Sequence, residues 1–279
     1  MTGDVLYSVL FELHAKQDAT LPATMGHQAH ALFLNLIAMF DLALSQQLHN
    51  EHGYRPFTVS SLVGVQARGG KILLRRGQAY YLRVTLLDGG TIWHRLCTHF
   101  LEAGPIAVSL SSAELQLTRM LSTPSADTTG WVNVSDWHTL ATLPAKRLIR
   151  LYFASPTAFH MGDREFLLFP ESLPLWESLL RVWNAYAPQR YQMDKEMVRA
   201  CIARDISTEG CELHTETLHF PKYVQKGFLG TCQYTVQKHA EQASFLTTLA
   251  AFAYYAGVGY KTTMGMGQVQ VSFGDSAVE

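Results

Sequence analysis

The stretch that decides the fold lies near the C-terminus and reads Gly257-Val-Gly-Tyr-Lys-Thr-Thr-Met-Gly-Met-Gly267. A helical pattern over residues 241–255 precedes it, and a strand pattern over residues 268–273 follows it. A nucleotide P-loop or a dinucleotide fingerprint needs its glycines after a strand and before a helix. The order here is helix, loop, strand, which argues against both sites. The loop therefore either holds a phosphate chain, with Lys261 adding charge, or only connects the helix tightly to the strand.

Working outward, the second half of the chain repeats the order strand, helix, strand, strand, helix, strand. Its expected elements are a strand at 147–154, a helix at 175–186, strands at 212–220 and 227–236, the helix at 241–255 and the strand at 268–273. The first half has the same order. It comprises a strand at 4–15, helices at 29–40 and 41–49, strands at 57–63, 71–74 and 79–87, a helix at 91–103, and a strand pair at 106–110 and 114–120.

This β-α-β-β-α-β order is that of the ferredoxin-like fold. The sequence therefore predicts an α+β protein of two tandem ferredoxin-like (RRM-like) domains, 1–122 and 131–279, with the glycine-rich loop in the second. A polar stretch rich in turn-forming residues, 123–130, is the expected linker.

Composition limits what such a chain can do. It has 279 residues, 48% of them hydrophobic, which is enough for two cores. No apolar run approaches the length of about 18 residues that spans a membrane, and the N-terminus does not resemble a signal peptide, so we expect a cytoplasmic protein. The four cysteines form no CxxC pair and are expected to be reduced; they are Cys97, Cys201, Cys211 and Cys232.

The net charge of −1 means that a polyanion would have to be held by local basic clusters. Two clusters are visible in the sequence: Arg68, Lys71, Arg75 and Arg76 in the first half, and Lys146, Arg147 and Arg150 in the second. Each cluster alone is equally consistent with solvated charges at strand ends.

The glycine-rich stretch, with its helix before and strand after, resembles the C-terminal motif of the repeat-associated RNA-binding (RAMP) superfamily. Within that superfamily the chain is most similar to the CRISPR repeat-RNA endoribonucleases, the Cas-six family. The matching segments follow one another in the family's order along almost the whole chain. They are His30-Ala-Leu-Phe-Leu-Asn-Leu-Ile, Gln47-Leu-His-Asn, Arg55-Pro-Phe-Thr-Val-Ser, Phe153-Ala-Ser-Pro-Thr-Ala-Phe159, the helix around Trp183-Asn184, and Gly227-Phe-Leu-Gly-Thr-Cys-Gln-Tyr234.

The resemblance implies a metal-independent endoribonuclease that binds CRISPR repeat RNA and cuts the precursor transcript into crRNAs. The ribose 2′-hydroxyl would attack the adjacent phosphate and leave a 2′,3′-cyclic phosphate and a 5′-hydroxyl. No cofactor or metal is expected. The implied partners are repeat RNA or crRNA and subunits of a CRISPR effector complex, and the implied state is a monomer or homodimer. The alternatives are a catalytically inactive RNA-binding subunit of such a complex, and a domain pair that binds a nucleotide or small ligand.

The resemblance also assigns catalytic residues. His49 occupies the place of the family's catalytic histidine and would act as general base or general acid, and Arg55 would stabilise charge on the phosphate. The alternative for His49 is a solvated histidine at a helix end. A tyrosine found in some members is absent, because leucines stand in that neighbourhood. Its role falls to one of four candidates, of which His30 could instead pack in the core: His27, His30, His52 and Tyr54.

RNA contacts are expected from the glycine-rich loop and the basic clusters, and salt should weaken them. The expected residues are Gly257, Gly259, Lys261, Gly265, Gly267, Arg68, Lys71, Arg75, Arg76, Arg147 and Arg150. Aromatic residues Tyr80, Tyr81 and Tyr260 are candidates for stacking on bases, although aromatic residues in strands more often belong to the core.

Overall fold

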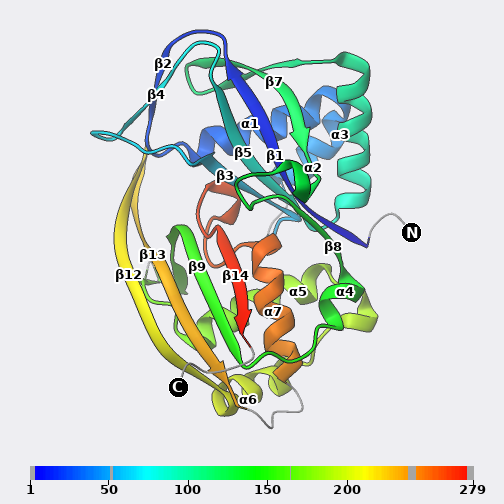
Figure 1. Ribbon diagram of the computed structural model, residues 1–279, viewed down its shortest axis with the longest axis vertical. Coiled ribbons are helices and arrows are strands. Elements are labelled where there is room, and N and C mark those ends of the chain that lie inside the picture. The colour runs from blue at the N-terminus through cyan, green and yellow to red at the C-terminus, as the bar shows by residue number, and fades with distance from the viewer. Residues whose placement is uncertain (1–3, 51–52, 164, 238–242, 275–279) are drawn as a thin grey trace. The chain divides into compact units, whose positions relative to one another are not determined.

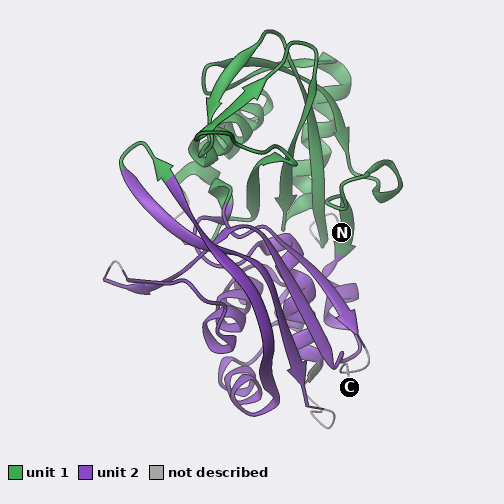
Figure 2. Cartoon of the chain, turned by 60° about the vertical axis from the view of Figure 1, so that its left-hand side comes forward, with its two compact units in different colours: residues 1–135, 219–222, 263–265 green, residues 136–218, 223–262, 266–279 purple. Residues whose placement is uncertain are grey.

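The computed structural model describes residues 4–50, 53–163, 165–237 and 243–274 (Figure 1). The chain forms two compact units (Figure 2). The first unit comprises residues 1–135 with 219–222 and 263–265, and the second comprises 136–218, 223–262 and 266–279. The tip of the glycine-rich loop, Thr263–Gly265, thus belongs to the first unit although its flanks belong to the second.

The first unit is built on one antiparallel sheet of order β3-β5-β1-β7-β6, with β8 also paired to β1. Its strands are β1 (Val5–Ala15), β3 (Phe57–Val63), β5 (Ala79–Leu86), β6 (Ile106–Leu110), β7 (Ala113–Leu121) and β8 (Asn133–Asp136). Its helices are α1 (Gly26–Phe40), α2 (Leu42–Asn50) and α3 (Gly89–Ala103), and a separate ribbon joins β2 (Ala19–Pro22) to β4 (Lys71–Leu74). The order β3-β5-β1-β7 is that of a ferredoxin-like sheet.

Alternation along the central strand β1 explains the layering. Val9, Phe11 and Leu13 are fully buried on the face that α1 and α3 cover. Asp41 ends α1 and begins α2: its carboxylate accepts a hydrogen bond from the Leu44 amide at 2.9 Å. Asp41 therefore caps the start of α2.

The second unit repeats the plan with a sheet of order β12-β13-β9-β14. Its strands are β9 (Leu148–Thr157), β12 (Ile206–Phe220), β13 (Tyr223–Val236) and β14 (Val269–Gly274), with a small hairpin of β10 (Phe159–Gly162) and β11 (Glu165–Leu167). Its helices are α4 (Trp137–Ala141), α5 (Ser172–Tyr186), α6 (Lys195–Asp205) and α7 (Ala243–Ala256). An aromatic core of Trp137, Trp183 and Phe252 joins α4, α5 and α7, with ring centroids 5.1 to 5.5 Å apart. The tandem ferredoxin-like prediction is confirmed.

The expectation that all four cysteines are reduced is wrong for two of them. Cys211 on β12 and Cys232 on β13 form a disulfide, with their Cα atoms 4.1 Å apart on neighbouring strands. They are separated by 21 positions in sequence, so only the strand pairing reveals that they are adjacent. Cys97 and Cys201 are free thiols. None of the described helices is long and apolar enough to cross a lipid bilayer.

Candidate active site and RNA interface

Arg55 is fixed against the end of the helix that carries His49. His49 is exposed in the last turn of α2. The Arg55 guanidinium donates from Nε to the Leu48 carbonyl and from NH2 to the His49 carbonyl, both at 3.0 Å. Carbonyls at a helix C-terminus lack helical partners and attract a cation. These bonds use two of the five N–H donors of an arginine, so the remaining donors are positioned beside His49.

His30 on α1 is held in one orientation. Its side chain is 6% exposed, and its ring stacks on Phe57 with centroids 5.6 Å apart. Its Nδ1 lies 3.2 Å from the carbonyl oxygen of Thr263 in the glycine-rich loop. A carbonyl can only accept, so Nδ1 carries the hydrogen and Nε2 carries the lone pair of the neutral ring.

Burial lowers the pKa of His30 to about 4, and the positive charge of Arg55 adds to this effect. The hydrogen bond to Thr263 raises the pKa of His30 and so opposes this shift. His49 and His27 lower the pKa, as Arg55 does. His30 is therefore neutral at pH 7. Because these groups all act on its charge, His27, His30, His49 and Arg55 share one neighbourhood of the first unit.

The tip of the glycine-rich loop packs closely against α1 and β3. The Gly265 amide donates to the Val59 carbonyl at 2.8 Å. A Cβ atom added to Gly26, the first residue of α1, would lie 1.8 Å from the Met264 carbonyl oxygen. Gly26 is therefore required for this approach. Sequence reasoning missed it, although a glycine that opens a helix was a visible signal.

The rest of the loop folds on itself in the second unit. Gly257, Gly259 and Gly267 have positive φ, and a Cβ on Gly259 would lie 2.4 Å from the Ala158 carbonyl oxygen. The amides of Gly257 and Gly267 donate to the carbonyls of Ala253 and Pro156 at 2.9 and 3.1 Å. Together with the Gly265 bond, this means that three of the four glycines predicted to contact RNA use their amides to shape the loop.

Lys261 is the cation of this loop, and its φ of 57° is left-handed. Its Nζ donates a hydrogen bond to the Tyr223 hydroxyl. The same nitrogen lies 3.7 Å from the centre of the Tyr223 ring and 5.1 Å from the centre of the Tyr260 ring. Burial lowers the pKa of Lys261. The Tyr260 ring in turn stacks on His160 of the β10–β11 hairpin, with centroids 5.7 Å apart. Aromatic rings thus fix the lysine on the loop.

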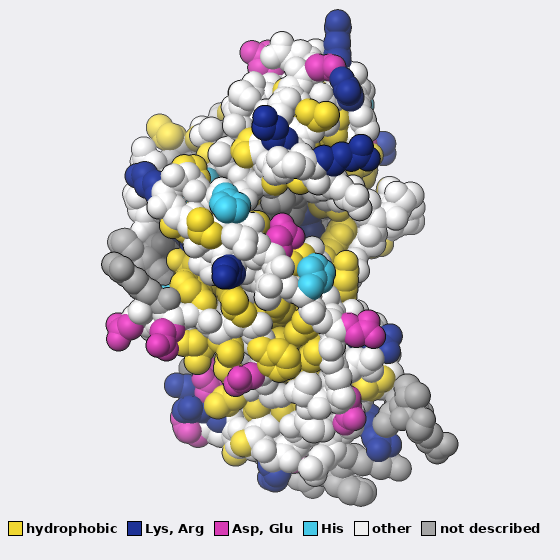
Figure 3. All heavy atoms as spheres, turned by 90° about the vertical axis from the view of Figure 1, so that its left-hand side faces the viewer, with side chains coloured by type: hydrophobic (Ala, Val, Ile, Leu, Met, Phe, Trp, Pro, Cys, Tyr) yellow, Lys and Arg dark blue, Asp and Glu magenta, His cyan; other side chains and the backbone are white. Residues whose placement is uncertain are grey.

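The structure brings one basic cluster together on the β2–β4 ribbon. Arg68 and Lys71 exchange backbone hydrogen bonds across a turn, and Arg75 pairs with Asp18 at 2.8 Å. Arg76 lies beside them, its amide bonded to the same carboxylate. Lysine and arginine side chains gather over the upper part of the face in Figure 3, which belongs to the first unit. The other predicted cluster is in the second unit, where Arg147 and Arg150 are exposed at the start of β9.

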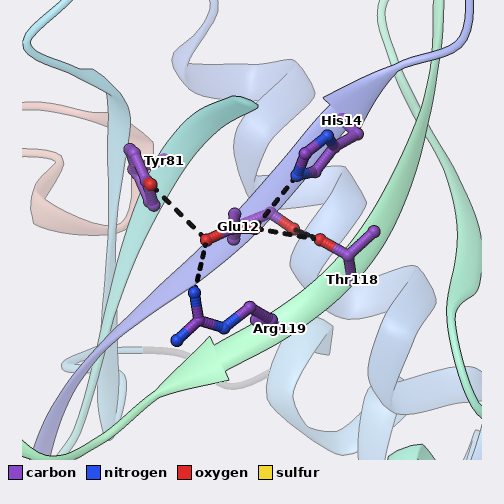
Figure 4. A network of polar contacts seen from close by, with 5 residues as sticks. All are labelled: Glu12, His14, Tyr81, Thr118 and Arg119. Atoms are coloured by element: carbon purple, nitrogen blue, oxygen red, sulfur yellow. Dashed lines mark hydrogen bonds and ion pairs between the residues drawn. The ribbon is translucent and has the colours of Figure 1, made fainter. Parts of the chain in front are cut away.

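The other candidates are placed less favourably for RNA. Tyr80 is buried, and its hydroxyl accepts a hydrogen bond from the Arg75 amide at 2.8 Å, so it is a core residue. Tyr81 points to the buried carboxylate of Glu12 (Figure 4). His27 packs edge-on against the Phe220 ring, and Tyr54 is exposed. His52 lies outside the described residues.

Both units match models of one protein family. Residues 5–142 match the CRISPR Cas6 N-terminal domain, and residues 151–269 match CRISPR-associated endoribonuclease Cas6. A curated relative, CRISPR-associated endoribonuclease Cas6 of Mycobacterium tuberculosis, is 25% identical over 128 residues. That match covers 46% of this chain and 40% of the relative, so the chain spans less than half the length of the curated relatives it matches.

Solved structures match over nearly the whole chain. The product complex of Cas6 (TTHB231) has a TM-score of 0.80 at 25% identity and covers 96% of this chain and 100% of that chain. Thermus thermophilus Cas6 (TTHB231) has a TM-score of 0.73 at 26% identity, with coverage of 96% and 99%. A substrate mimic complex of Cas6 (TTHA0078) has a TM-score of 0.70 at 26% identity, with the same coverage. From the two family models and these structures together, we conclude that the chain belongs to the CRISPR-associated Cas6 family.

Proposed function

We propose that this protein is a metal-independent endoribonuclease that binds CRISPR repeat RNA and cuts the precursor transcript into crRNAs. The observation that carries the proposal is the anchoring of Arg55 on the helix end that bears His49, in the neighbourhood of the neutral His30. In this arrangement His49 is the proton donor, Arg55 is the cation and His30 is the proton acceptor. A subunit that only binds RNA has no need of it.

In the proposed reaction the ribose 2′-oxygen attacks the adjacent phosphorus, and the bond from phosphorus to the 5′-oxygen breaks. His30 Nε2 receives the proton of the 2′-hydroxyl, because Thr263 fixes the hydrogen on Nδ1. The negative charge of a bound phosphate raises the pKa of His30 from about 4 towards neutrality, which favours this step. His49 gives a proton to the departing 5′-oxygen, and the products are a 2′,3′-cyclic phosphate and a 5′-hydroxyl.

Arg55 stabilises the charge that develops on the non-bridging phosphate oxygens. Its free N–H donors are preorganised by its two bonds to the end of α2, so little ordering remains to be done when RNA binds. Lys261 and the basic β2–β4 ribbon contact phosphates of the repeat, and the glycines around Lys261 hold it in place. Association with CRISPR effector subunits, and a monomeric or homodimeric state, stay predictions.

The test compares cleavage of labelled repeat RNA, in EDTA, by the wild type and by His49→Ala and His30→Ala. We expect each variant to bind RNA and to cleave about 100- to 10,000-fold more slowly. His94→Ala, which removes an exposed histidine from α3, is the matched control and should cleave normally.

A substrate with sulfur in place of the bridging 5′-oxygen separates the two roles, because a thiolate leaves without a proton. That substrate should restore cleavage by His49→Ala but not by His30→Ala. Tight binding of the host's repeat without any cleavage by the wild type would instead identify an inactive RNA-binding subunit.

A further inference from the structure

The helix-free faces of the two sheets are built differently. In the first unit the centre of this face is filled by side chains that interact with one another. Arg83 is 1% exposed, donates to the Ser8 hydroxyl and lies 4.4 Å from the centre of the Trp131 ring. Beside it the buried Glu12 carboxylate contacts four side chains: His14, Tyr81, Thr118 and Arg119 (Figure 4). A buried carboxylate repels phosphate, and its neighbours are already engaged, so this face is unsuited to RNA.

The corresponding face of the second unit is open at its centre. Tyr152 on β9 is 46% exposed, and Arg150, two positions earlier on the same strand, is exposed as well. Leu151, which lies between these two residues, and Phe153, which follows Tyr152, are fully buried on the opposite face. Tyr152 therefore stands in the middle of a sheet, on a strand bordered by β13 and β14, without being part of the core.

The strand register surrounds these two side chains with uncharged polar groups. Tyr152 lies opposite Thr231 on β13 and Gln270 on β14. Arg150 lies opposite Gln233 on β13 and Ser272 on β14. We name these six residues the β9 face: Arg150, Tyr152, Thr231, Gln233, Gln270 and Ser272.

We propose that the β9 face binds a single-stranded segment of the repeat RNA, with a nucleobase stacked on Tyr152 and a neighbouring phosphate held by Arg150. An aromatic ring presented from a central strand of a four-stranded sheet is a stacking platform that accepts any base. Amide and hydroxyl side chains around it can hydrogen-bond to base edges. The proposal rests on the proposed function, since it names a further contact with the same RNA.

The charged residues on the open face of the second sheet indicate where the RNA backbone can run. Cys232 is buried and lies opposite Leu151, so its disulfide partner Cys211 points to the helix-covered face. The next residue, Glu212, is exposed and therefore points to the open face at the β12 edge. Phosphates should avoid this carboxylate and run on the β9–β14 side, where Arg150 lies.

The test measures binding of repeat RNA that carries a 2′-deoxyribose at the cleavage site, so that it stays intact. Tyr152→Thr keeps a residue favoured in strands but removes the ring, and should weaken binding about 5- to 100-fold. Tyr152→Phe keeps the ring and should bind as the wild type does. Phe273→Ala is the matched control: this ring is 37% exposed on β14 but lies opposite Ile149, on the other face of the sheet, and its loss should not change binding.

Salt dependence separates stacking from charge. Arg150→Gln should reduce the slope of log affinity against log salt concentration by about 0.7, whereas Tyr152→Thr should leave that slope unchanged. A photoreactive 4-thiouridine in the single-stranded part of the repeat should cross-link to Tyr152.

The outcomes separate the two proposals. Wild-type protein that binds and cleaves repeat RNA, with Tyr152→Thr binding equally well and no cross-link at Tyr152, would overturn the β9 face and leave the proposed function standing. Wild-type protein that does not bind repeat RNA would overturn both.

Discussion

The neutral state of His30 makes a quantitative prediction about acid stability. In the unfolded chain a histidine titrates near 6.5, whereas burial lowers the pKa of His30 to about 4 in the folded protein. Between these values the unfolded state binds more protons than the folded state, so stability falls as the pH is lowered. The loss of unfolding free energy begins below about pH 6.5, increases as the pH is lowered to about 4, and then levels off.

The interval between the two pKa values sets the magnitude. At about 1.4 kcal/mol for each pKa unit, His30 alone removes about 3 kcal/mol of unfolding free energy by pH 4 and about 2 kcal/mol by pH 5. His30→Asn keeps an N–H donor for Thr263 but cannot titrate. At pH 7 it should be less stable than the wild type because the stacking on Phe57 is lost. That deficit should shrink as the pH falls.

Urea unfolding of both proteins at pH 7, 6 and 5, without RNA, provides the assay. The wild type should lose about 2 kcal/mol more than His30→Asn between pH 7 and pH 5. His94→Asn controls for the removal of an exposed histidine. A constant difference between wild type and His30→Asn across this range, or an NMR titration of the His30 ring near 6.5, would refute the reasoning.

Three further perturbations act on other parts of the structure. Gly26→Ala places a Cβ 1.8 Å from the Met264 carbonyl oxygen, so it should cost about 1–3 kcal/mol in urea unfolding and slow cleavage; unchanged stability would show that the loop tip does not pack there. Arg55→Lys removes the guanidinium that donates to two carbonyls at the end of α2. We expect faster amide hydrogen exchange in the last turn of α2 and cleavage at least about 10-fold slower. Cys211→Ser opens a link across 21 positions and should cost the oxidised protein about 3 kcal/mol; an equal loss with and without reductant would argue against the disulfide.

The element order was predictable because most strands and helices carry an apolar pattern that is visible in the sequence. Val9, Phe11 and Leu13 recur at every second position of β1, although Ser8, Leu10 and Glu12 are buried as well, and the helix-loop-strand order around Lys261 was visible in the glycine spacing. The start of β12 was missed because residues 207–210 are all exposed, which leaves no alternation to detect, and the start of β13 was missed because its buried residue is the polar Gln225. Helix α6 was also missed, although Val198, Cys201 and Ile202 have helical spacing and are buried.

The candidate site was only partly accessible from the sequence. His49 and Arg55 lie six positions apart and could be paired by their resemblance to family motifs. The contact between His30 and Thr263 joins residues 233 positions apart, and it requires the folded loop. The same holds for Gly26, whose role depends on a carbonyl at the other end of the chain, and for the internal use of the Gly267 amide.

The central claim is that the chain's own side chains cleave repeat RNA. Its most direct test is a single-turnover reaction with the host's CRISPR repeat RNA in EDTA, with the ends of the products identified by mass spectrometry. The account predicts one cut, a 2′,3′-cyclic phosphate on the upstream product and a 5′-hydroxyl on the downstream product, all abolished by a 2′-deoxyribose at the cut site. Cleavage that requires added divalent metal, or that persists on the 2′-deoxy substrate, would contradict it.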